Sequence, residues 1–120
     1  MPKLIASPTQ IAAVGNLTKY ANEYIGLVNT GESKLSITLV QSPAGWQGVG
    51  QYADYREYRI VYKGVLHVQY EDGTLEVEAG QGLEVNPGEW VRYSTPGEAG
   101  ADYVTVCVPA FSRAGVHRDE

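Results

Sequence analysis

Short segments of alternating apolar and polar residues, each ended by glycine, proline or Asp-Gly, constrain the fold of this chain most strongly. In residues 35–40, leucine or isoleucine occupies every second position, so one face of an extended strand would be buried and the other would be polar. The Asp72-Gly73 pair separates two further alternating segments, and Asp-Gly in that place is the strongest short-range signal for a β-hairpin. The pattern predicts an all-β domain.

Seven strands are predicted on this basis, in residues 35–40, 55–62, 65–70, 75–79, 83–85, 90–94 and 103–108. In the second of them, Glu57, Arg59 and Val61 share one face, because side chains alternate along a strand. The first 34 residues are less regular. We expect a weak helical turn in residues 9–14, a short edge strand at Leu4 and Ile5, and a segment around residues 20–25 that covers the outside of the β-domain.

Size and charge limit the classes of function. The chain has 120 residues, which fits one domain, and 43% of them are apolar, enough for a core. The formal net charge is −5 without a block of basic residues, so no nucleic-acid partner is expected, because phosphate binding needs clustered lysine and arginine. A small ligand, neutral or anionic, remains compatible with this charge if an arginine points inward.

The cysteine content and the apolar runs of the sequence indicate where in the cell the protein is expected. Cys107 is the single cysteine, so no intramolecular disulfide indicates an oxidising compartment, and we expect a small buried residue there rather than a reactive thiol. No apolar run approaches the ~18 residues of a membrane span, and the first residues lack the apolar centre of a signal peptide. These features predict a cytoplasmic protein without a membrane partner.

Two glycine-led stretches carry a more specific pattern. The first places residues on a fixed frame at Gly45, Gln51, Ala53, Glu57 and Gly64, and the second does so at Gly80, Asn86, Gly88, Val91 and Thr95. This spacing resembles the two motifs of the cupin superfamily, over residues ~35 to 120. In that family the first motif is glycine, His-x-His, glutamate and glycine, and the second is glycine, Pro-x-Gly, histidine and asparagine.

The resemblance implies a fold and an organisation. It implies a single-domain double-stranded β-helix, a jelly-roll-like barrel of two antiparallel sheets. Residues 1–34 would form an arm that packs on the barrel or on a partner subunit, residues 35–110 the barrel, and residues 111–120 a C-terminal tail. Small cupins usually pair as homodimers, so a homodimer is expected here.

The resemblance also shows what the chain lacks. Cupin metal sites use three imidazoles and one carboxylate, but the histidine places here hold Gln51, Ala53 and Val91. The chain has two histidines, of which His67 should face outward and His117 lies in the tail. We therefore expect no metal and no other cofactor, with alanine and valine filling the barrel instead.

Glu57 occupies the carboxylate place of the family, which points into the barrel. A carboxylate in a mostly apolar cup suits a general acid or base. Arg59 should share its face, and two interpretations remain open. The two residues form a structural ion pair, or they act as a base beside a guanidinium that binds a negative group of a substrate.

Several aromatic and amide side chains should surround this pair. The predicted rim and wall consist of Trp46, Gln47, Gln51, Tyr52, Tyr55 and Tyr93. Aromatic faces and amides suit sugars, sugar acids or flat hydroxylated rings, although each of these residues alone is also explained by packing.

The leading functional hypothesis is a metal-independent cupin that binds a small polar metabolite, anionic or sugar-like. It would catalyse proton transfer, as an isomerase, epimerase, cyclase or lyase does, with Glu57 as acid or base and Arg59 holding a negative group. The rim residues would orient the substrate, with Gln51, Tyr52 and Tyr93 as polar contacts and Trp46 stacking on it. Two alternatives remain: a non-catalytic ligand-binding or sensor domain, and a metal-dependent oxygenase or lyase with unusual ligands.

Overall fold

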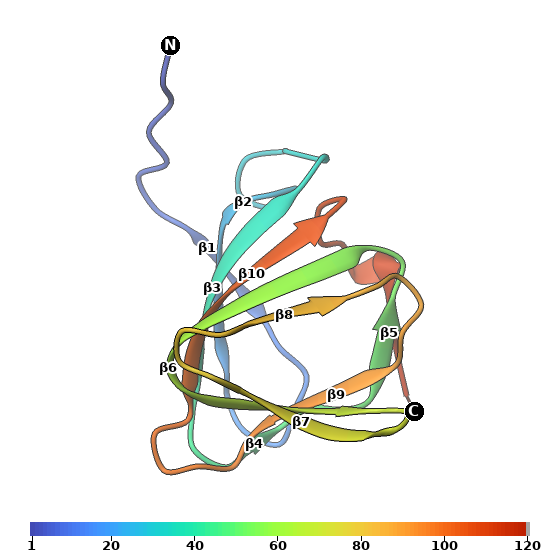
Figure 1. The fold of residues 1–120 in the computed structure, drawn as a ribbon. Helices are drawn as coiled ribbons and strands as arrows, with labels where there is room; N and C mark the ends of the chain where they lie inside the picture. The colour runs from blue at the N-terminus through green and yellow to red at the C-terminus, as the bar shows by residue number, and fades with distance from the viewer. Residues whose placement is uncertain (120) are drawn as a thin grey trace.

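Nearly all regular secondary structure of the chain is β-strand in the computed structural model, which describes residues 1–119 (Figure 1). The strands are β1 (Thr9–Ala12), β2 (Tyr20–Ile25), β3 (Ser36–Ser42), β4 (Trp46–Gln47), β5 (Gln51–Ala53), β6 (Arg56–Tyr70), β7 (Gly73–Glu78), β8 (Gly82–Val85), β9 (Val91–Thr95), β10 (Ala101–Val108) and β11 (Val116–Arg118). A short 3₁₀ turn, η1 (Arg113–Gly115), precedes the last strand. Within the described residues, no helix has the length and hydropathy needed to cross a membrane.

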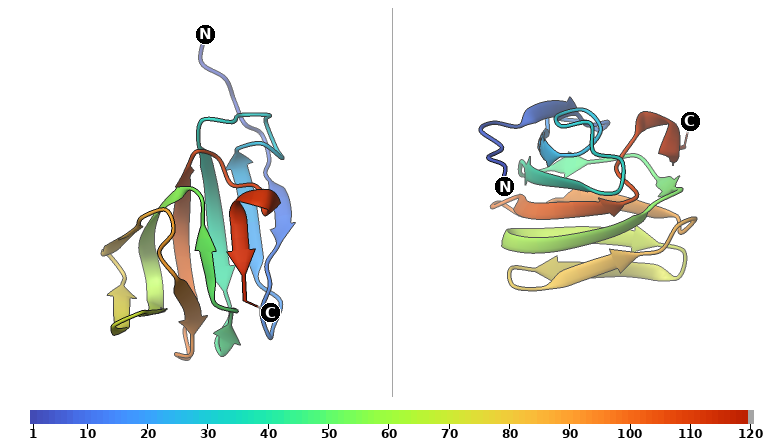
Figure 2. Two further views of the ribbon diagram at one scale, coloured as in Figure 1. Left: turned by 90° about the vertical axis from the view of Figure 1, so that its right-hand side faces the viewer. Right: turned by 90° about the horizontal axis from the view of Figure 1, so that it is seen from above.

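The strands form one strongly curled antiparallel sheet in the order β1-β2-β3-β10-β6-β9-β5-β11. The 15-residue β6 belongs to both walls of the resulting barrel: its first half pairs with β10 and β8, and its second half pairs with β7 and β9. The two walls are seen on opposite sides of the barrel in Figure 1, and Figure 2 shows the same strands from two further sides. The prediction of an all-β antiparallel barrel is confirmed, and the two predicted sheets are the two walls of one continuous sheet that β6 joins.

The bend of β6 lies at Gly64, one of the motif glycines. Its φ of 74° lies in the left-handed region, and a Cβ there would clash with the carbonyl oxygen of Gly100. The pairing of β6 with β10 shifts register between Asp102 and Tyr103, close to this bend. As a result the inward positions change from odd to even numbers, and Val61 before the bend and Leu66 after it are both fully buried.

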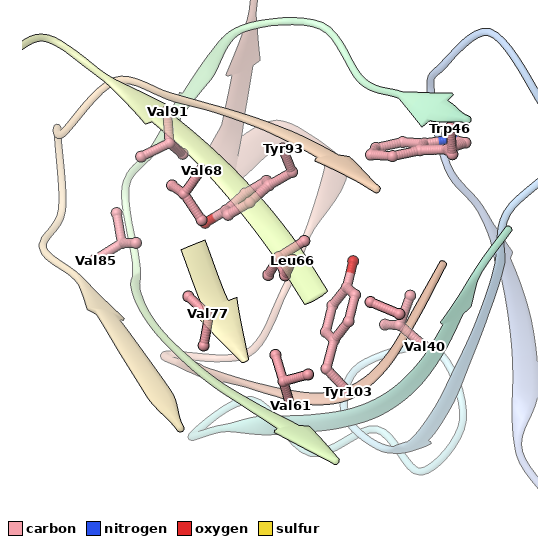
Figure 3. Close-up of a cluster of buried hydrophobic side chains, with 11 residues drawn as sticks. Val40, Trp46, Val61, Leu66, Val68, Val77, Val85, Val91, Tyr93 and Tyr103 are labelled. Carbon is pink, nitrogen blue, oxygen red and sulfur yellow. The ribbon is translucent and has the colours of Figure 1, made fainter. Parts of the chain in front are cut away.

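The core fills the part of the barrel around the second half of β6 (Figure 3). Leu66 and Val68 of β6 pack with inward residues of β7, β8 and β9, whose members are Val77, Val85, Val91 and Tyr93. Tyr103 of β10 and Trp46 of β4 close the cluster on the other side. Alternation predicts these positions, because every second residue of each strand faces inward.

The N-terminal segment differs from the sequence-based expectation. The helical turn predicted for residues 9–14 is wrong, because Thr9–Ala12 is a strand that pairs in register with β2. Leu4 and Ile5 lie outside any strand. A ladder with β2 satisfies the backbone groups of this segment, whereas an isolated helical turn has too few hydrogen bonds to be stable. β2 continues the wall through β3, and the division into arm, barrel and tail stays a prediction.

The C-terminal segment, residues 111–119, packs on β3 and pairs with β5 at the edge of the barrel. Phe111 donates its backbone N–H to Ser36 Oγ, and its ring packs edge-on against Tyr55 at 6.1 Å between centroids. Ser112 then caps η1, and β11 pairs with β5. The tail prediction at residue 120 lies outside the described residues.

Candidate functional site

A cavity of about 110 Å³ lies inside the barrel beside the apolar core, and Val40, Trp46 and Tyr93 belong to both. Its walls come from β1 to β6, β9 and β10, together with the loops after β1 and β4 and the C-terminal segment. The polar and ionisable side chains among its lining residues are Lys19, Thr38, Gln51, Tyr55, Glu57, Arg59, Tyr93, Thr105, Cys107 and Arg118, and Trp46 adds an indole face. The interior of the barrel therefore contains a polar pocket beside an apolar core.

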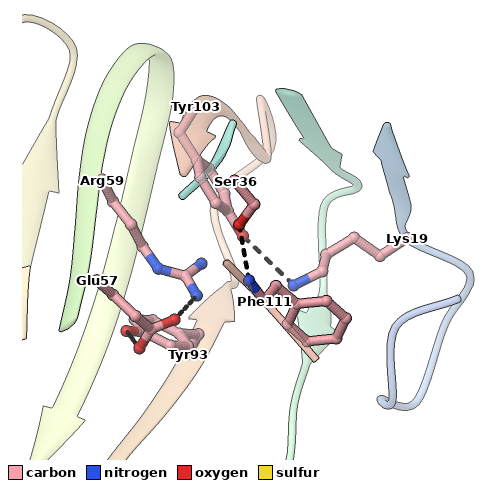
Figure 4. A network of polar contacts seen from close by, with 7 residues as sticks. All are labelled: Lys19, Ser36, Glu57, Arg59, Tyr93, Tyr103 and Phe111. Carbon is pink, nitrogen blue, oxygen red and sulfur yellow. Dashed lines mark hydrogen bonds and ion pairs between the residues drawn. The ribbon is translucent and has the colours of Figure 1, made fainter. Parts of the chain in front are cut away.

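A buried polar cluster forms one wall of the cavity (Figure 4). Arg59 Nη2 donates to Glu57 Oε1 at 2.9 Å, and Tyr93 Oη donates to Glu57 Oε2 at 3.2 Å. Glu57 is 3% exposed and Arg59 is 7% exposed, so the pair is almost entirely removed from water. Both side chains point inward because they occupy alternate positions of the first half of β6.

Aromatic rings hold the guanidinium of Arg59 in place. Its Cζ lies 3.8 Å from the ring centroid of Tyr93 and 5.3 Å from that of Tyr103. Burial alone would lower the pKa of Arg59, but Tyr93 and Glu57 outweigh it and the pKa lies well above its usual value. Burial also raises the pKa of Tyr93 well above its usual value, so this phenol stays protonated and can donate.

Cys107 lies beside the cluster, opposite Glu57 in the pairing of β10 with β6. Burial, and then the charge of Glu57, raises the pKa of this thiol from 9.0 to about 12. A thiol that stays protonated is a weak nucleophile and a weak metal ligand. The expectation of a small buried cysteine at this position agrees with the geometry.

Six of the eight predicted site residues line the cavity: Trp46, Gln51, Tyr55, Glu57, Arg59 and Tyr93. The other two point away from it. Tyr52 is 44% exposed and stacks on His117, with 4.6 Å between ring centroids, and Gln47 is exposed on the outside of β4. Alternation explains both, since the residues next to Gln47 and Tyr52 in β4 and β5 face inward. The roles assigned to the eight residues stay predictions.

Lys19, which the sequence analysis did not identify, reaches the cavity from the loop between β1 and β2. Its Nζ lies 3.3 Å from Tyr103 Oη and 3.7 Å from the ring centroid of Trp46. Burial lowers its pKa from the usual value. Its neighbours in sequence show no strand periodicity, so no local signal indicates where it points. Thr105 was also missed, although alternation along β10 places it on the inward face with Cys107.

The residues at the family's metal-binding places do not fit a transition metal. Ala53 and Val91 carry no donor atom and are buried, and the two oxygens of Glu57 already accept from Arg59 and Tyr93. Among residues 1–119, no three histidine, cysteine or acidic side chains lie close enough to share an ion. His67 lies near Glu76 and His117 near Asp54, both outside the cavity.

Comparison with known proteins supports the barrel assignment. Oxalate decarboxylase from Bacillus subtilis has a TM-score of 0.77 at 16% identity, over 95% of this chain and 30% of the other. A single-residue variant of Streptomyces PAC13 with uridine has a TM-score of 0.77 at 12% identity, over 100% of this chain and 93% of the other. A further structure of Pac13, described as a unique nucleoside dehydratase, has a TM-score of 0.76 at 12% identity, over 100% of this chain and 91% of the other.

One curated sequence and one family model also match. Endoribonuclease YbeY from Myxococcus xanthus (strain DK1622) is 30% identical over 101 residues, which are 84% of this chain and 34% of the relative. This chain thus spans about a third of that relative's length. The resemblance to cupins is confirmed by the fold. The model of the AraC-like ligand binding domain matches residues 52–120, more than half of the chain, and the protein therefore belongs to this family of cupin-type ligand-binding domains.

Proposed function

We propose that this domain binds a small polar metabolite in the barrel cavity, without a metal. The observation that carries the proposal is the buried ion pair of Glu57 and Arg59 at the wall of an open cavity. A buried ion pair is a poor device for stability, because the cost of removing two charges from water offsets most of their attraction. Such a pair is better explained by a ligand that contacts it.

We further propose that Glu57 transfers a proton in the bound metabolite. A single carboxylate suffices for an isomerisation, in which it removes a proton from one carbon and returns the same proton to a neighbouring carbon on the same face. It also suffices for an elimination in which the proton taken from carbon passes to the departing hydroxyl, which leaves as water. Tyr93 would hold Glu57 in position, and Arg59 would stabilise negative charge that develops on the substrate.

The similar proteins agree with small-molecule chemistry in a barrel of this shape. The PAC13 structures are described with uridine and as those of a nucleoside dehydratase, and the other neighbour is a decarboxylase of oxalate. At 12–16% identity these neighbours support the fold of this chain, and they do not identify its substrate. An RNA substrate like that of an endoribonuclease is not favoured, since the chain has a net charge of −5.

An unbiased metabolite screen by thermal shift tests the proposal, because a ligand bound only by the folded state raises the melting temperature. Each hit is then incubated with wild type, Glu57→Gln and the exposed control Glu84→Gln, and product is followed by mass spectrometry. We expect turnover in wild type and in the control. Glu57→Gln should lower turnover by at least ~100-fold while affinity changes little. A screen without any hit would argue against a ligand-binding cavity.

The second candidate is a non-catalytic ligand-binding or sensor domain. The observation that favours it is that both oxygens of Glu57 are already hydrogen-bonded in the ligand-free protein. In that case a hit from the screen binds, no product forms with wild type, and Glu57→Gln changes only the affinity.

We propose that the domain pairs as a homodimer through the outer face of β6. Tyr58, Ile60 and Tyr62 form a row on this face, and their exposed fractions are 38%, 59% and 50%, respectively. A monomer rarely leaves such a contiguous apolar row uncovered, and a second copy would cover it with the same residues by two-fold symmetry. Sedimentation equilibrium should show a dimer that Ile60→Asp dissociates. A monomeric wild type contradicts this.

A further inference from the structure

We propose that the metabolite is a small carboxylic acid with a second oxygen atom, and that Lys19 rather than Arg59 binds its carboxylate. This inference rests on the proposed function, because it names the class of ligand for the same cavity. It departs from the sequence-based hypothesis, in which Arg59 held the negative group. Four observations support it, and they concern charge, hydrogen-bond partners, unpaired donors and size.

The cavity has more positive than negative charge. Lys19 and Arg59 are its two inner cations, and Glu57 is the carboxylate among the lining residues. The exposed Arg118 at the mouth adds a third cation. This local excess occurs in a chain whose formal net charge is −5, so it does not follow from composition. One inner positive charge is left over after the pairing of Glu57, and a monoanion would balance it.

Part of the Arg59 guanidinium is already committed to protein groups. Its Nη2 donates to Glu57 at 2.9 Å, and its Cζ lies 3.8 Å from the Tyr93 ring. Lys19 is different, because within the described residues no acidic side chain forms a salt bridge with it. In the described part of the chain, its ammonium donates to the hydroxyl of Tyr103 at 3.3 Å. An ammonium has three donors, so Lys19 can accept a carboxylate as a further partner.

The partial burial of Lys19 is consistent with an uncompensated charge. Removal from water lowers its pKa, and Arg59 adds to this effect. Tyr103 and Glu57 act in the opposite direction and do not restore the usual value. A carboxylate close to Nζ would stabilise the charged form of Lys19.

Unpaired polar atoms mark where the second oxygen of the ligand would bind. Thr105 Oγ1 and Arg59 Nε are buried and lack a hydrogen-bond partner in the described part of the chain. Both residues line the cavity and each is 7% exposed. They lie opposite each other in the pairing of β10 with β6, and Tyr103 is the next inward residue of β10. An oxo or hydroxyl oxygen near Thr105 would pair with both atoms.

The size of the cavity favours a carboxylate over a phosphate ester. A volume of about 110 Å³ is well below the roughly 300–1,000 Å³ of sites for drug-sized ligands. A phosphate ester also carries about 1.5 to 2 negative charges at pH 7, more than the single charge that Lys19 leaves uncompensated. The indole of Trp46, in contact with the Lys19 ammonium, offers an apolar surface to the carbon skeleton of the acid.

Matched acids and amides test the proposal by calorimetry at constant ionic strength. The probes are lactate against lactamide and mandelate against mandelamide, and each hit of the metabolite screen is tested beside its own amide or acid. The proteins are wild type, Lys19→Met, Lys19→Arg and the exposed control Lys34→Met. We expect the wild type to bind acids at least ~10-fold more tightly than amides. Lys19→Met should abolish this preference, whereas Lys19→Arg and Lys34→Met should retain it.

The outcomes separate this inference from the proposed function. Equal affinity for acid and amide, a preference that survives in Lys19→Met, or hits that are all neutral would overturn the carboxylate inference and leave the binding function intact. No hit of any kind would overturn both.

A ligand-free measurement tests whether Lys19 is kept for binding rather than for stability. Methionine keeps an unbranched apolar side chain at this position but removes the uncompensated charge. Lys19→Met should therefore raise the melting temperature by about 4 °C, while Lys34→Met leaves it unchanged. A lower melting temperature for Lys19→Met would assign Lys19 a structural role and contradict the proposal.

Discussion

The two halves of β6 present opposite chemistry to the same barrel interior. Before the bend at Gly64, the inward residues Glu57 and Arg59 line the open cavity. After the bend, the inward residues Leu66 and Val68 are fully packed in the apolar core. One continuous strand therefore contributes both to the site and to the core that supports it.

The difference shows how the barrel combines a stable core with a polar site. The second half buries aliphatic side chains, which stabilise the fold in proportion to the apolar area removed from water. The first half buries an ion pair and a phenol, which contribute little net stability but fix donors and acceptors in one geometry. Substitutions in the first half should therefore destabilise the protein by unpairing charges or hydrogen bonds. Substitutions in the second half should destabilise it by removing packed apolar volume.

The largest effect is expected from breaking the ion pair in the first half. Arg59→Met leaves Glu57 buried without its counterion, and removal of one partner of a buried pair costs about 3–5 kcal/mol in the free energy of unfolding. Chemical denaturation measures this. Arg56→Met, on the outward face of the same strand, is the control and should stay within about 1 kcal/mol.

A double variant shows whether the cost comes from the unpaired charge. Glu57→Leu with Arg59→Met removes both charges and should recover most of the stability lost in Arg59→Met alone. If the double variant is as unstable as the single one, the shape of the arginine rather than its charge holds this wall together.

In the second half of β6, a smaller side chain should lower the free energy of unfolding. Leu66→Ala creates a cavity in the closed core and should cost about 2–5 kcal/mol in the free energy of unfolding. Leu75→Ala in β7, where the side chain is 37% exposed, is the matched control with a much smaller loss. Leu66→Ala should leave ligand affinity at the cavity nearly unchanged, and a loss of affinity as large as that of a site variant would contradict the separation of the two halves.

Much of the fold follows from the sequence because its signals are local. Alternation along β6 and β10 predicts which residues face inward, and turn glycines such as Gly64 mark where strands end or bend. The inward pair of Glu57 and Arg59 follows from this parity together with the motif frame. The short β1 was missed because its strand character depends on pairing with β2, which no local pattern specifies.

The candidate site was harder to predict than the fold. Tyr52 and Gln47 were assigned to the rim from their residue types, but alternation in two- and three-residue strands turns them outward. Lys19 was missed because it lies in an irregular loop, and only the tertiary structure brings it to Trp46. Loop residues lack the periodicity that fixes the direction of a strand side chain.

A smaller effect is expected from removing one hydroxyl of the polar cluster. Tyr93→Phe leaves Glu57 Oε2 without its donor while the ring stays against Arg59, and should cost about 1–3 kcal/mol in the free energy of unfolding. Tyr70→Phe, in the second half of β6, is the matched control and should change stability by less than about 0.5 kcal/mol. If Tyr93→Phe and Tyr70→Phe changed the free energy of unfolding equally, the hydrogen bond from Tyr93 to Glu57 would contribute no more to stability than the hydroxyl of Tyr70 does.

The smallest effect is expected in how the free energy of unfolding depends on alkaline pH, and it comes from the first half of β6. The pKa of Cys107, beside the first half of β6, is raised from 9.0 to about 12, mainly by burial. Above pH 9 the unfolded chain loses this proton while the folded chain keeps it, so stability falls as the pH rises from 9 towards 12, by up to about 1.4 kcal/mol per pH unit.

Urea denaturation of wild type and Cys107→Ala between pH 8 and about 10.5 measures this slope. The variant should lose stability by an offset at every pH, because a buried side chain is shortened, but its profile should be shallower above pH 9. Tyr55 and Tyr93, whose pKa values are raised by burial, act with the same sign in both proteins and cancel in the difference.

Val68→Ala should shift the profile without changing its slope, because the second half of β6 buries no ionisable side chain among its inward residues Leu66 and Val68. Parallel profiles for wild type and Cys107→Ala would mean that the thiol beside Glu57 is not shielded from water, and that the first half of β6 is less enclosed than its geometry indicates.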